Sequence, residues 1–137
     1  IREPGIYGSQ SYESLVQTCK DSGSSLGFEA VDCFQSNHEG AIIDAIQHAY
    51  GTYDGIVINP AGYTHTSVAI LDALKAVSIP AVEVHISAVE ERESFRQISY
   101  VREACLETIT GEGIAGYSHA LELLHAYLAL EAQPSRP

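Results

Sequence analysis

Apolar positions recur every three or four residues in four stretches of the chain, the spacing that predicts amphipathic helices. The predicted helices run from Tyr12 to Leu26, from Ile42 to Ala49, from Thr66 to Val77 and from Ile114 to Leu130. Ser9 or Ser11 is a candidate cap for the first helix, and Gly27 is a natural stop. Gly51 ends the second, and the third stops before Pro80.

Short runs rich in β-branched residues lie between these helices and predict strands. The predicted strands cover Phe28 to Phe34, Gly55 to Ile58, Ala81 to Ile86 and Cys105 to Thr110. The second and third runs do not alternate between polar and apolar residues, as expected of strands buried on both faces. Strands separated by helices with short connections indicate a doubly wound α/β domain, in which helices cover both faces of a parallel sheet.

The remaining segments are predicted to lack a regular core element. Glu90 to Gln97 is charged and predicts a loop with a helical turn, and Glu131 to Pro137 predicts a loose tail. Ile1 to Gly8 is a loop that leads directly into a helix, whereas a doubly wound domain normally begins with a strand. We therefore interpret residues 1–137 as one domain and expect a strand before Ile1 to be missing.

Composition limits the classes of partner. The 137 residues carry a formal charge of −11, which disfavours nucleic acids and anionic membranes as partners. No apolar stretch approaches the roughly 18 residues that span a bilayer, and we expect a soluble cytoplasmic protein. The three cysteines, Cys19, Cys33 and Cys105, have no metal-ligand spacing, so we expect no metal and interpret all three as core residues.

Polar residues lie at the ends of three of the predicted strands, Gln35 to Asn37, Asn59 to Pro60 and His85 to Ser87, at the sheet edge where doubly wound folds bind ligands. The first cluster runs from Asn59 to Ser67 and lies between a strand and a helix, where Asn59 and His65 could orient hydroxyls or a carboxylate. Alternatively, Thr64, Thr66 or Ser67 only caps the helix and His65 is exposed.

The second cluster lies at the end of the strand from Ala81 to Ile86. Strand periodicity places Glu83 and His85 on the same face. A carboxylate beside an imidazole fixes its tautomer and raises its pKa, as a general acid requires. The alternative is a buried, satisfied pair without a catalytic role.

The third cluster, from Arg2 to Gly8, carries an arginine and a tyrosine on a loop. A cation near a phenol favours the phenolate, which would make Tyr7 a usable base near neutral pH. A tyrosine that only packs in a surface loop is the simpler reading of this segment alone.

These segments together resemble type II 3-dehydroquinate dehydratases in order and spacing. The matching motifs are Arg2 to Gly8, Phe34 to Gly40, Ile58 to Ser67 and Val82 to Ser87, and the resemblance extends to about Leu124. It implies a flavodoxin-like fold and the dehydration of 3-dehydroquinate to 3-dehydroshikimate, through an enolate, in the shikimate pathway of aromatic amino acid biosynthesis. It implies no metal or organic cofactor, and subunits that form trimers assembled into a homododecamer.

The resemblance also implies roles for single residues. Tyr7 matches the base, Arg2 the cation that stabilises its phenolate, His85 the acid and Glu83 the residue that orients it. Asn59, Ser87 and the backbone amide of Ile86 match the groups that hold the substrate carboxylate. His65 and Arg96 match the groups that hold the ring hydroxyls. Asp72 matches a residue that approaches the neighbouring subunit's site.

The chain departs from the family's pattern in three places. The family's first strand and its Asn-Gly-Pro-Asn-Leu-Asn loop are absent, Ala88 stands where the family usually has Asn, and the run from Glu90 to Tyr100 differs around Arg96. The main alternative is a non-catalytic flavodoxin-like domain that binds an anionic metabolite or a protein. A serine hydrolase is disfavoured because neither Ser67 nor Ser87 lies in a G-x-S-x-G elbow.

Overall fold

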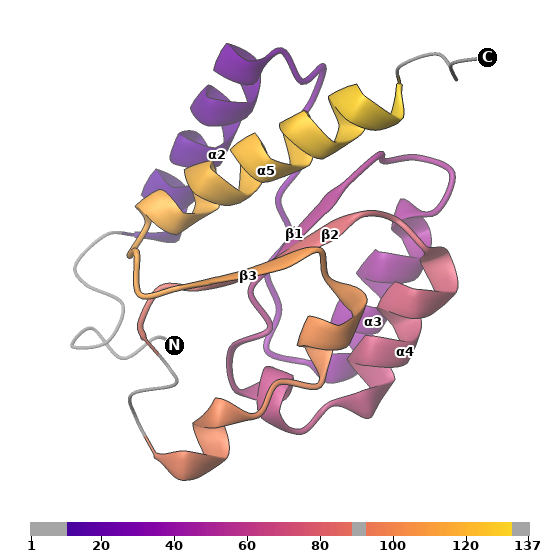
Figure 1. Ribbon diagram of the computed structural model, residues 1–137, viewed down its shortest axis with the longest axis vertical. Coiled ribbons are helices and arrows are strands. Elements are labelled where there is room, and N and C mark those ends of the chain that lie inside the picture. The colour runs from indigo at the N-terminus through magenta and orange to yellow at the C-terminus, as the bar shows by residue number, and fades with distance from the viewer. Residues whose placement is uncertain (1–10, 89–92, 133–137) are drawn as a thin grey trace.

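A parallel sheet of three strands forms the centre of the computed structural model, which describes residues 11–88 and 93–132. The strands β1 (Ile56–Ile58), β2 (Ala81–His85) and β3 (Glu107–Thr110) lie in that order. Helices α2 (Tyr12–Leu26) and α5 (Ala115–Glu131) cover one face of the sheet, and α3 (Glu39–Ala49) and α4 (Val68–Val77) cover the other (Figure 1). This arrangement confirms the predicted α/β class.

Two helix starts follow from capping side chains. The Ser11 hydroxyl accepts a hydrogen bond from the Ser14 N–H at 3.1 Å, so α2 begins at Tyr12 as predicted. Ser67 accepts from the Ile70 N–H at 2.9 Å, so α4 begins at Val68 rather than at Thr66. The residues before Ser67 instead form a 3₁₀ helix, η1 (Ala61–His65), which the sequence pattern did not predict.

Two further 3₁₀ helices connect β2 to β3. The first, η3 (Ser94–Gln97), corresponds to the predicted helical turn, whereas the second, η4 (Val101–Ala104), was not predicted. The tail was predicted to begin at Glu131, but α5 continues to Glu131, so the helix ends one residue later than predicted. The predicted N-terminal loop and the rest of the tail lie outside the described residues.

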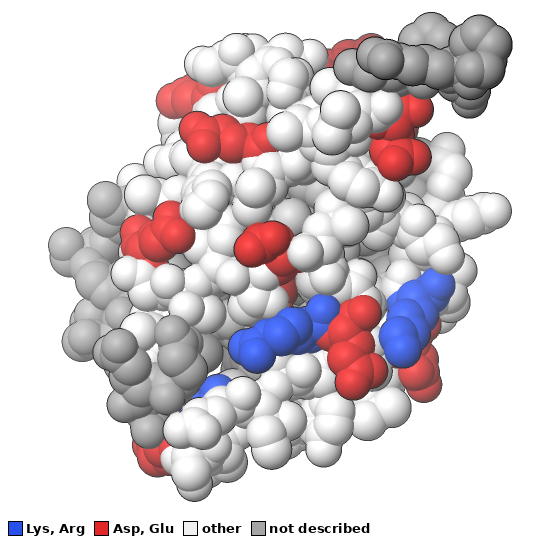
Figure 2. Space-filling view, viewed as in Figure 1, with Lys and Arg blue, Asp and Glu red and all other residues white. Residues whose placement is uncertain are grey.

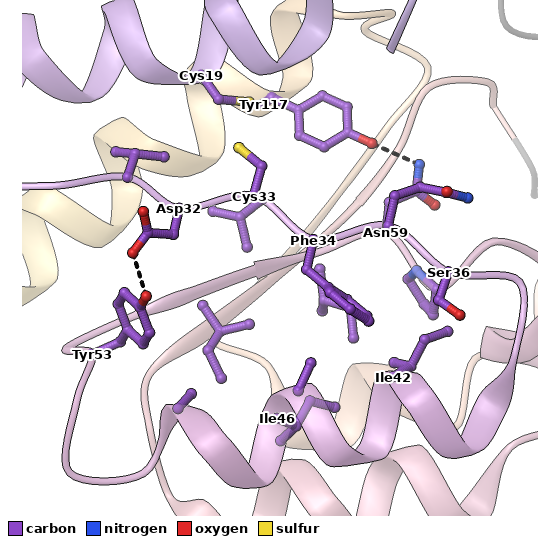
Figure 3. Close-up of a pocket in the computed structure, with 18 of the residues that line it drawn as sticks. Cys19, Asp32, Cys33, Phe34, Ser36, Ile42, Ile46, Tyr53, Asn59 and Tyr117 are labelled. Carbon is purple, nitrogen blue, oxygen red and sulfur yellow. Dashed lines mark hydrogen bonds between the residues drawn. The ribbon is translucent and has the colours of Figure 1, made fainter. Parts of the chain in front are cut away.

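The predicted strand from Phe28 to Phe34 is wrong. This segment belongs to no strand, and within the described residues β1 pairs only with β2. The segment and β1 both line a cavity of about 1710 Å³, which Figure 3 shows in part. A strand needs a hydrogen-bonded neighbour, and the cavity lies where that neighbour would be. Apolar and β-branched character alone therefore did not make this segment a strand.

Alternation along β2 separates its residues between two cores. Val82 and Val84 point to the α2 and α5 side and pack in a core with Leu121. Ala81 belongs to the opposite core, with Leu74 of α4. All five residues of β2 are buried, as predicted. Since side chains two residues apart share a face, Glu83 and His85 lie on the same face as Ala81.

The cysteines only partly match their prediction as core residues. Cys19 is buried and Cys105 is half-buried, but Cys33 is exposed, and all three are free thiols. Burial, and then the nearby negative charge of Glu83, raises the pKa of Cys105 to about 12. None of the described helices is both long enough and apolar enough to cross a membrane.

Gly116, the second residue of α5, allows this helix to approach the sheet closely. A Cβ atom there would lie 3.3 Å from Val84 Cγ1 and 3.4 Å from Ile109 Cγ2. We expect Gly116→Val to lower the free energy of unfolding by about 2 kcal/mol, because the added methyl groups overpack this contact. Urea titration measures the change.

Gly40 provides the matched control, since it is also the second residue of a helix. An added Cβ there would meet no atom within 4 Å. Gly40→Val should therefore change the free energy of unfolding by only about 0.5 kcal/mol. Equal effects at the two glycines would contradict the close contact of α5 with the sheet.

Candidate active site

A fully buried carboxylate, Glu83, lies at the centre of the candidate site. Its side chain is held by hydrogen bonds from four residues that come from different elements: His85, Thr64, Ser99 and Thr108. Thr108 is the residue paired with Glu83 across β2 and β3, which explains why its hydroxyl donates to Glu83 Oε1 at 3.2 Å. The parallel register thus supplies one donor directly.

Thr64 and Ser99 contribute two further hydroxyl groups to this carboxylate. The Thr64 hydroxyl donates to Glu83 Oε2 at 2.5 Å, and the Ser99 hydroxyl reaches the two carboxylate oxygens at 3.1 and 3.0 Å. The two hydroxyls lie 2.6 Å apart. Each has only one hydrogen, and with Thr64 donating to Glu83 the Ser99 hydrogen is shared between the Glu83 carboxylate and the Thr64 oxygen. These donors stabilise the charged form of Glu83.

The charge of Glu83 follows from two opposing effects. Burial alone would raise the pKa of Glu83, but the hydrogen bonds from His85, Thr64 and Ser99 outweigh burial and hold the pKa below its ordinary value. The carboxylate is therefore negative at neutral pH.

His85 is the direct partner of this carboxylate. Its Nε2 lies 2.5 Å from Glu83 Oε2, and the side chain is almost fully buried at the end of β2. This contact fixes the ring and leaves Nδ1 on the side away from Glu83. His65 of η1 stacks on His85, with ring centroids 6.5 Å apart and an interplanar angle of 16°. The structure thus brings together three of the predicted site residues.

His65 is anchored by the segment that follows η3. Its Nδ1 lies 2.6 Å from the carbonyl oxygen of Ile98, and its ring packs edge-on against Phe95 at 6.3 Å. His65 is half-buried, so the alternative of an exposed histidine is wrong. Arg96 lies 5.0 Å from the Phe95 ring centroid, and its Nε donates to Glu93 at 2.5 Å. Arg96 is therefore near His65 but paired with a carboxylate.

Asn59 follows β1 and lies at the same edge of the sheet. Its Oδ1 accepts from the Ala61 N–H at 3.0 Å, and its Nδ2 donates to the Tyr117 hydroxyl at 2.8 Å (Figure 3). Figure 3 shows Asn59 and Tyr117 together at one end of the cavity beside β1. Glu83 and His85 do not line this cavity. We place the candidate site at the carboxyl ends of β1 and β2 because the polar side chains meet there.

Ile86 and Ser87 form the turn directly after β2. The carbonyl of Ile86 accepts from the Gly113 N–H at 3.0 Å, and that of Ser87 accepts from the Gly111 N–H at 3.1 Å. Gly111 has φ 74°, a conformation that favours glycine. These bonds fix the turn beside His85.

Two groups of predicted site residues are not joined to this cluster. Asp72 is exposed on α4, and no contact links it to the other predicted residues among those described. Tyr7 and Arg2 lie outside the described residues.

Comparisons with known proteins give the family. The family described as dehydroquinase class II matches residues 1–125. The chain belongs to the type II dehydroquinase family. It is 50% identical over 133 residues to a 3-dehydroquinate dehydratase of Rhodopseudomonas palustris, covering 96% of this chain and 87% of that protein. It is 51% identical over 121 residues to catabolic 3-dehydroquinase 1 of Fusarium vanettenii, covering 88% and 83%.

Solved type II dehydroquinases share the fold. The structure from Butyrivibrio crossotus superposes with a TM-score of 0.85 at 54% identity, covering 90% of this chain and 86% of that chain. The structure from Propionibacterium acnes gives the same TM-score at 38% identity, covering 91% and 86%. The resemblance to this enzyme family and the flavodoxin-like fold that it implied are confirmed.

Sequence reasoning missed four residues of this dehydroquinase site. Thr64 was considered only as a helix cap, and Ser99, Thr108 and Tyr117 were not considered. Thr108 could have been found from the expected pairing of neighbouring strands. Ser99 and Tyr117 are far from their partners in sequence, so no local pattern indicated them.

The buried carboxylate generates a prediction about stability and pH. Because the folded-state pKa of Glu83 lies below its unfolded value of about 4.3, the carboxylate stabilises the fold above that pH. This contribution is lost as the pH falls through the folded-state pKa. Glu83→Gln should lower the free energy of unfolding by about 3 kcal/mol at pH 7, and by clearly less at pH 3. Urea titrations at several pH values measure the difference.

Glu112→Gln is a control for this experiment, since Glu112 is an exposed carboxylate paired with His119 at 3.0 Å. This variant should change stability by about 0.5 kcal/mol or less at either pH. A Glu83→Gln deficit that stayed constant from pH 7 to pH 3 would show that the charge of Glu83 is not what stabilises the fold.

Proposed function

We propose that the chain catalyses the dehydration of 3-dehydroquinate to 3-dehydroshikimate, with His85 as the general acid. The observation that carries this proposal is the buried Glu83–His85 pair at the carboxyl end of β2. A histidine whose ring is fixed by a carboxylate is suited to donating a proton to a departing hydroxyl. The type II dehydroquinase family of this chain and its relatives named as 3-dehydroquinate dehydratases support the substrate.

The reaction needs a base as well as an acid. In this proposal the phenolate of Tyr7 removes a proton next to the substrate ketone, and Arg2 stabilises the phenolate. The electrons of the broken C–H bond form an enolate. His85 then donates its Nδ1 proton to the leaving hydroxyl, the C–O bond breaks, and water departs as the enone forms. The Nε2 contact with Glu83 keeps Nδ1 directed away from the carboxylate.

The anionic substrate requires local donors, because the protein is strongly acidic. Acidic residues outnumber basic ones by 18 to 7, and Figure 2 shows several acidic and few basic side chains on one face. Arg96 and Lys75 each lie beside a carboxylate, Glu93 and Glu103 respectively.

Neutral donors therefore take the substrate carboxylate in this proposal. They are the amide of Asn59, the hydroxyl of Ser87 and the backbone N–H of Ile86. His65 and Arg96 hold the ring hydroxyls. The Arg96 guanidinium has further N–H groups besides the Nε that contacts Glu93, so this pair does not prevent it from binding a hydroxyl.

The acid and base roles predict a specific kinetic result. We expect Tyr7→Phe and His85→Ala each to lower kcat by about 100-fold or more, with little change in KM, since a positioned acid or base contributes in this range. Removal of Arg2 should resemble removal of Tyr7, whereas Arg96→Ala should mainly raise KM. The assay mixes the protein with 3-dehydroquinate and follows the absorbance of the conjugated enone.

His119→Ala is the matched control, because His119 also lies beside a glutamate, Glu112, but on the surface. It should retain the parent rate. If the parent protein gave no enone, the chain would instead fit a non-catalytic domain that binds an anionic metabolite or a protein. If Tyr7→Phe kept the parent rate, the phenolate mechanism would be wrong even for an active enzyme.

We further propose a cytoplasmic homododecamer made of trimers, in which Asp72 approaches a neighbouring subunit's site. Asp72 is exposed on α4, one turn after Val68, which is 51% exposed and apolar. The support for this role is the family resemblance, in which Asp72 matches a residue that approaches the neighbouring subunit's site. Light scattering at micromolar concentration should give a mass of at least a trimer. A monomer would contradict the role of Asp72.

A further inference from the structure

The amide of Asn59 is held at both ends. Its oxygen accepts from the Ala61 N–H at 3.0 Å, and its nitrogen donates to the Tyr117 hydroxyl at 2.8 Å. The backbone N–H of Ala61 can only donate, so the amide oxygen must face Ala61. The amide nitrogen must then face Tyr117, and the orientation of the whole group is determined.

This orientation leaves one hydrogen on Nδ2 for a ligand. The amide nitrogen carries two hydrogens in a plane, and they point in different directions. Since one is directed to the Tyr117 hydroxyl, the direction of the other is fixed by the same contact. An amide held only by Ala61 would be free to turn about its side-chain bonds.

Tyr117 can hold the side chain of Asn59 in one orientation because its own ring is held by the core. It lies in the first turns of α5, is only 7% exposed, and packs in the core formed by α2, α5 and β2. Its ring belongs to this core, while its hydroxyl reaches the edge of the sheet where β1 ends (Figure 3). The contact joins residues 58 positions apart.

We propose that Tyr117 is a positioning residue, which orients Asn59 so that its second Nδ2 hydrogen points at the substrate carboxylate. The inference rests on the proposed function, in which Asn59 binds that carboxylate. Tyr117 itself does not touch the substrate. It acts on binding through the rotamer of Asn59.

Tyr117→Phe tests this role because it removes the hydroxyl and keeps the ring in the core. We expect KM for 3-dehydroquinate to rise about fivefold, the change that loss of one neutral hydrogen bond produces. The value of kcat should stay within about twofold, because the lost contact serves binding. In an Asn59→Ala background, Tyr117→Phe should have no further effect on KM. An unchanged KM in the single variant, or additive effects in the double variant, would overturn the proposal.

Tyr127→Phe is the matched control, since Tyr127 lies on the same helix, further along α5. It should leave KM and kcat unchanged. A crystal structure of Tyr117→Phe provides a readout that does not depend on activity. We expect the Asn59 side chain to lose its single conformation there. An inactive parent protein would refute the proposed function alone, whereas an Asn59 amide that kept its orientation in the variant would refute the role of Tyr117.

Discussion

A buried negative charge is the constraint on which the site depends. Glu83 is fully enclosed in the central strand, and an enclosed carboxylate without donors would be very unfavourable. Its hydrogen bonds come from η1, from β2 and β3, and from the segment between η3 and η4. Any change in the relative position of these elements would leave part of the charge unsatisfied. The same bonds that stabilise the fold therefore hold the His85 ring in place.

The two faces of β2 differ: one packs in the apolar core and the other carries the polar network. Val82 and Val84 pack against the α2 and α5 layer and make the apolar core, while the alternate positions Glu83 and His85 carry the polar network. This division is possible because side chains alternate along a strand. The apolar core and the polar network thus share one strand without competing for the same space.

The sequence predicted the four described α-helices and all three strands of the sheet because capping residues and β-branched runs are local signals. Ser11, Gly27 and the run from Ala81 to Ile86 are examples. It failed for residues 28–34, because strand formation there depends on a neighbour that the described residues do not supply. The Glu83–His85 pair was predictable from its two-residue spacing. The hydrogen-bond partners Ser99 and Tyr117 were not, since each meets its partner only after the chain has folded.

The order of the partners along the chain has a consequence during synthesis. Glu83 depends on Ser99 and Thr108, and Asn59 depends on Tyr117, all of which follow the residues that they hold. A chain emerging from the ribosome exposes β1 and β2 before β3 and α5 exist. Until those elements dock, the carboxylate of Glu83 must remain in water, so β2 cannot close into its core. The last third of the chain thus controls when the first two thirds become a folded protein.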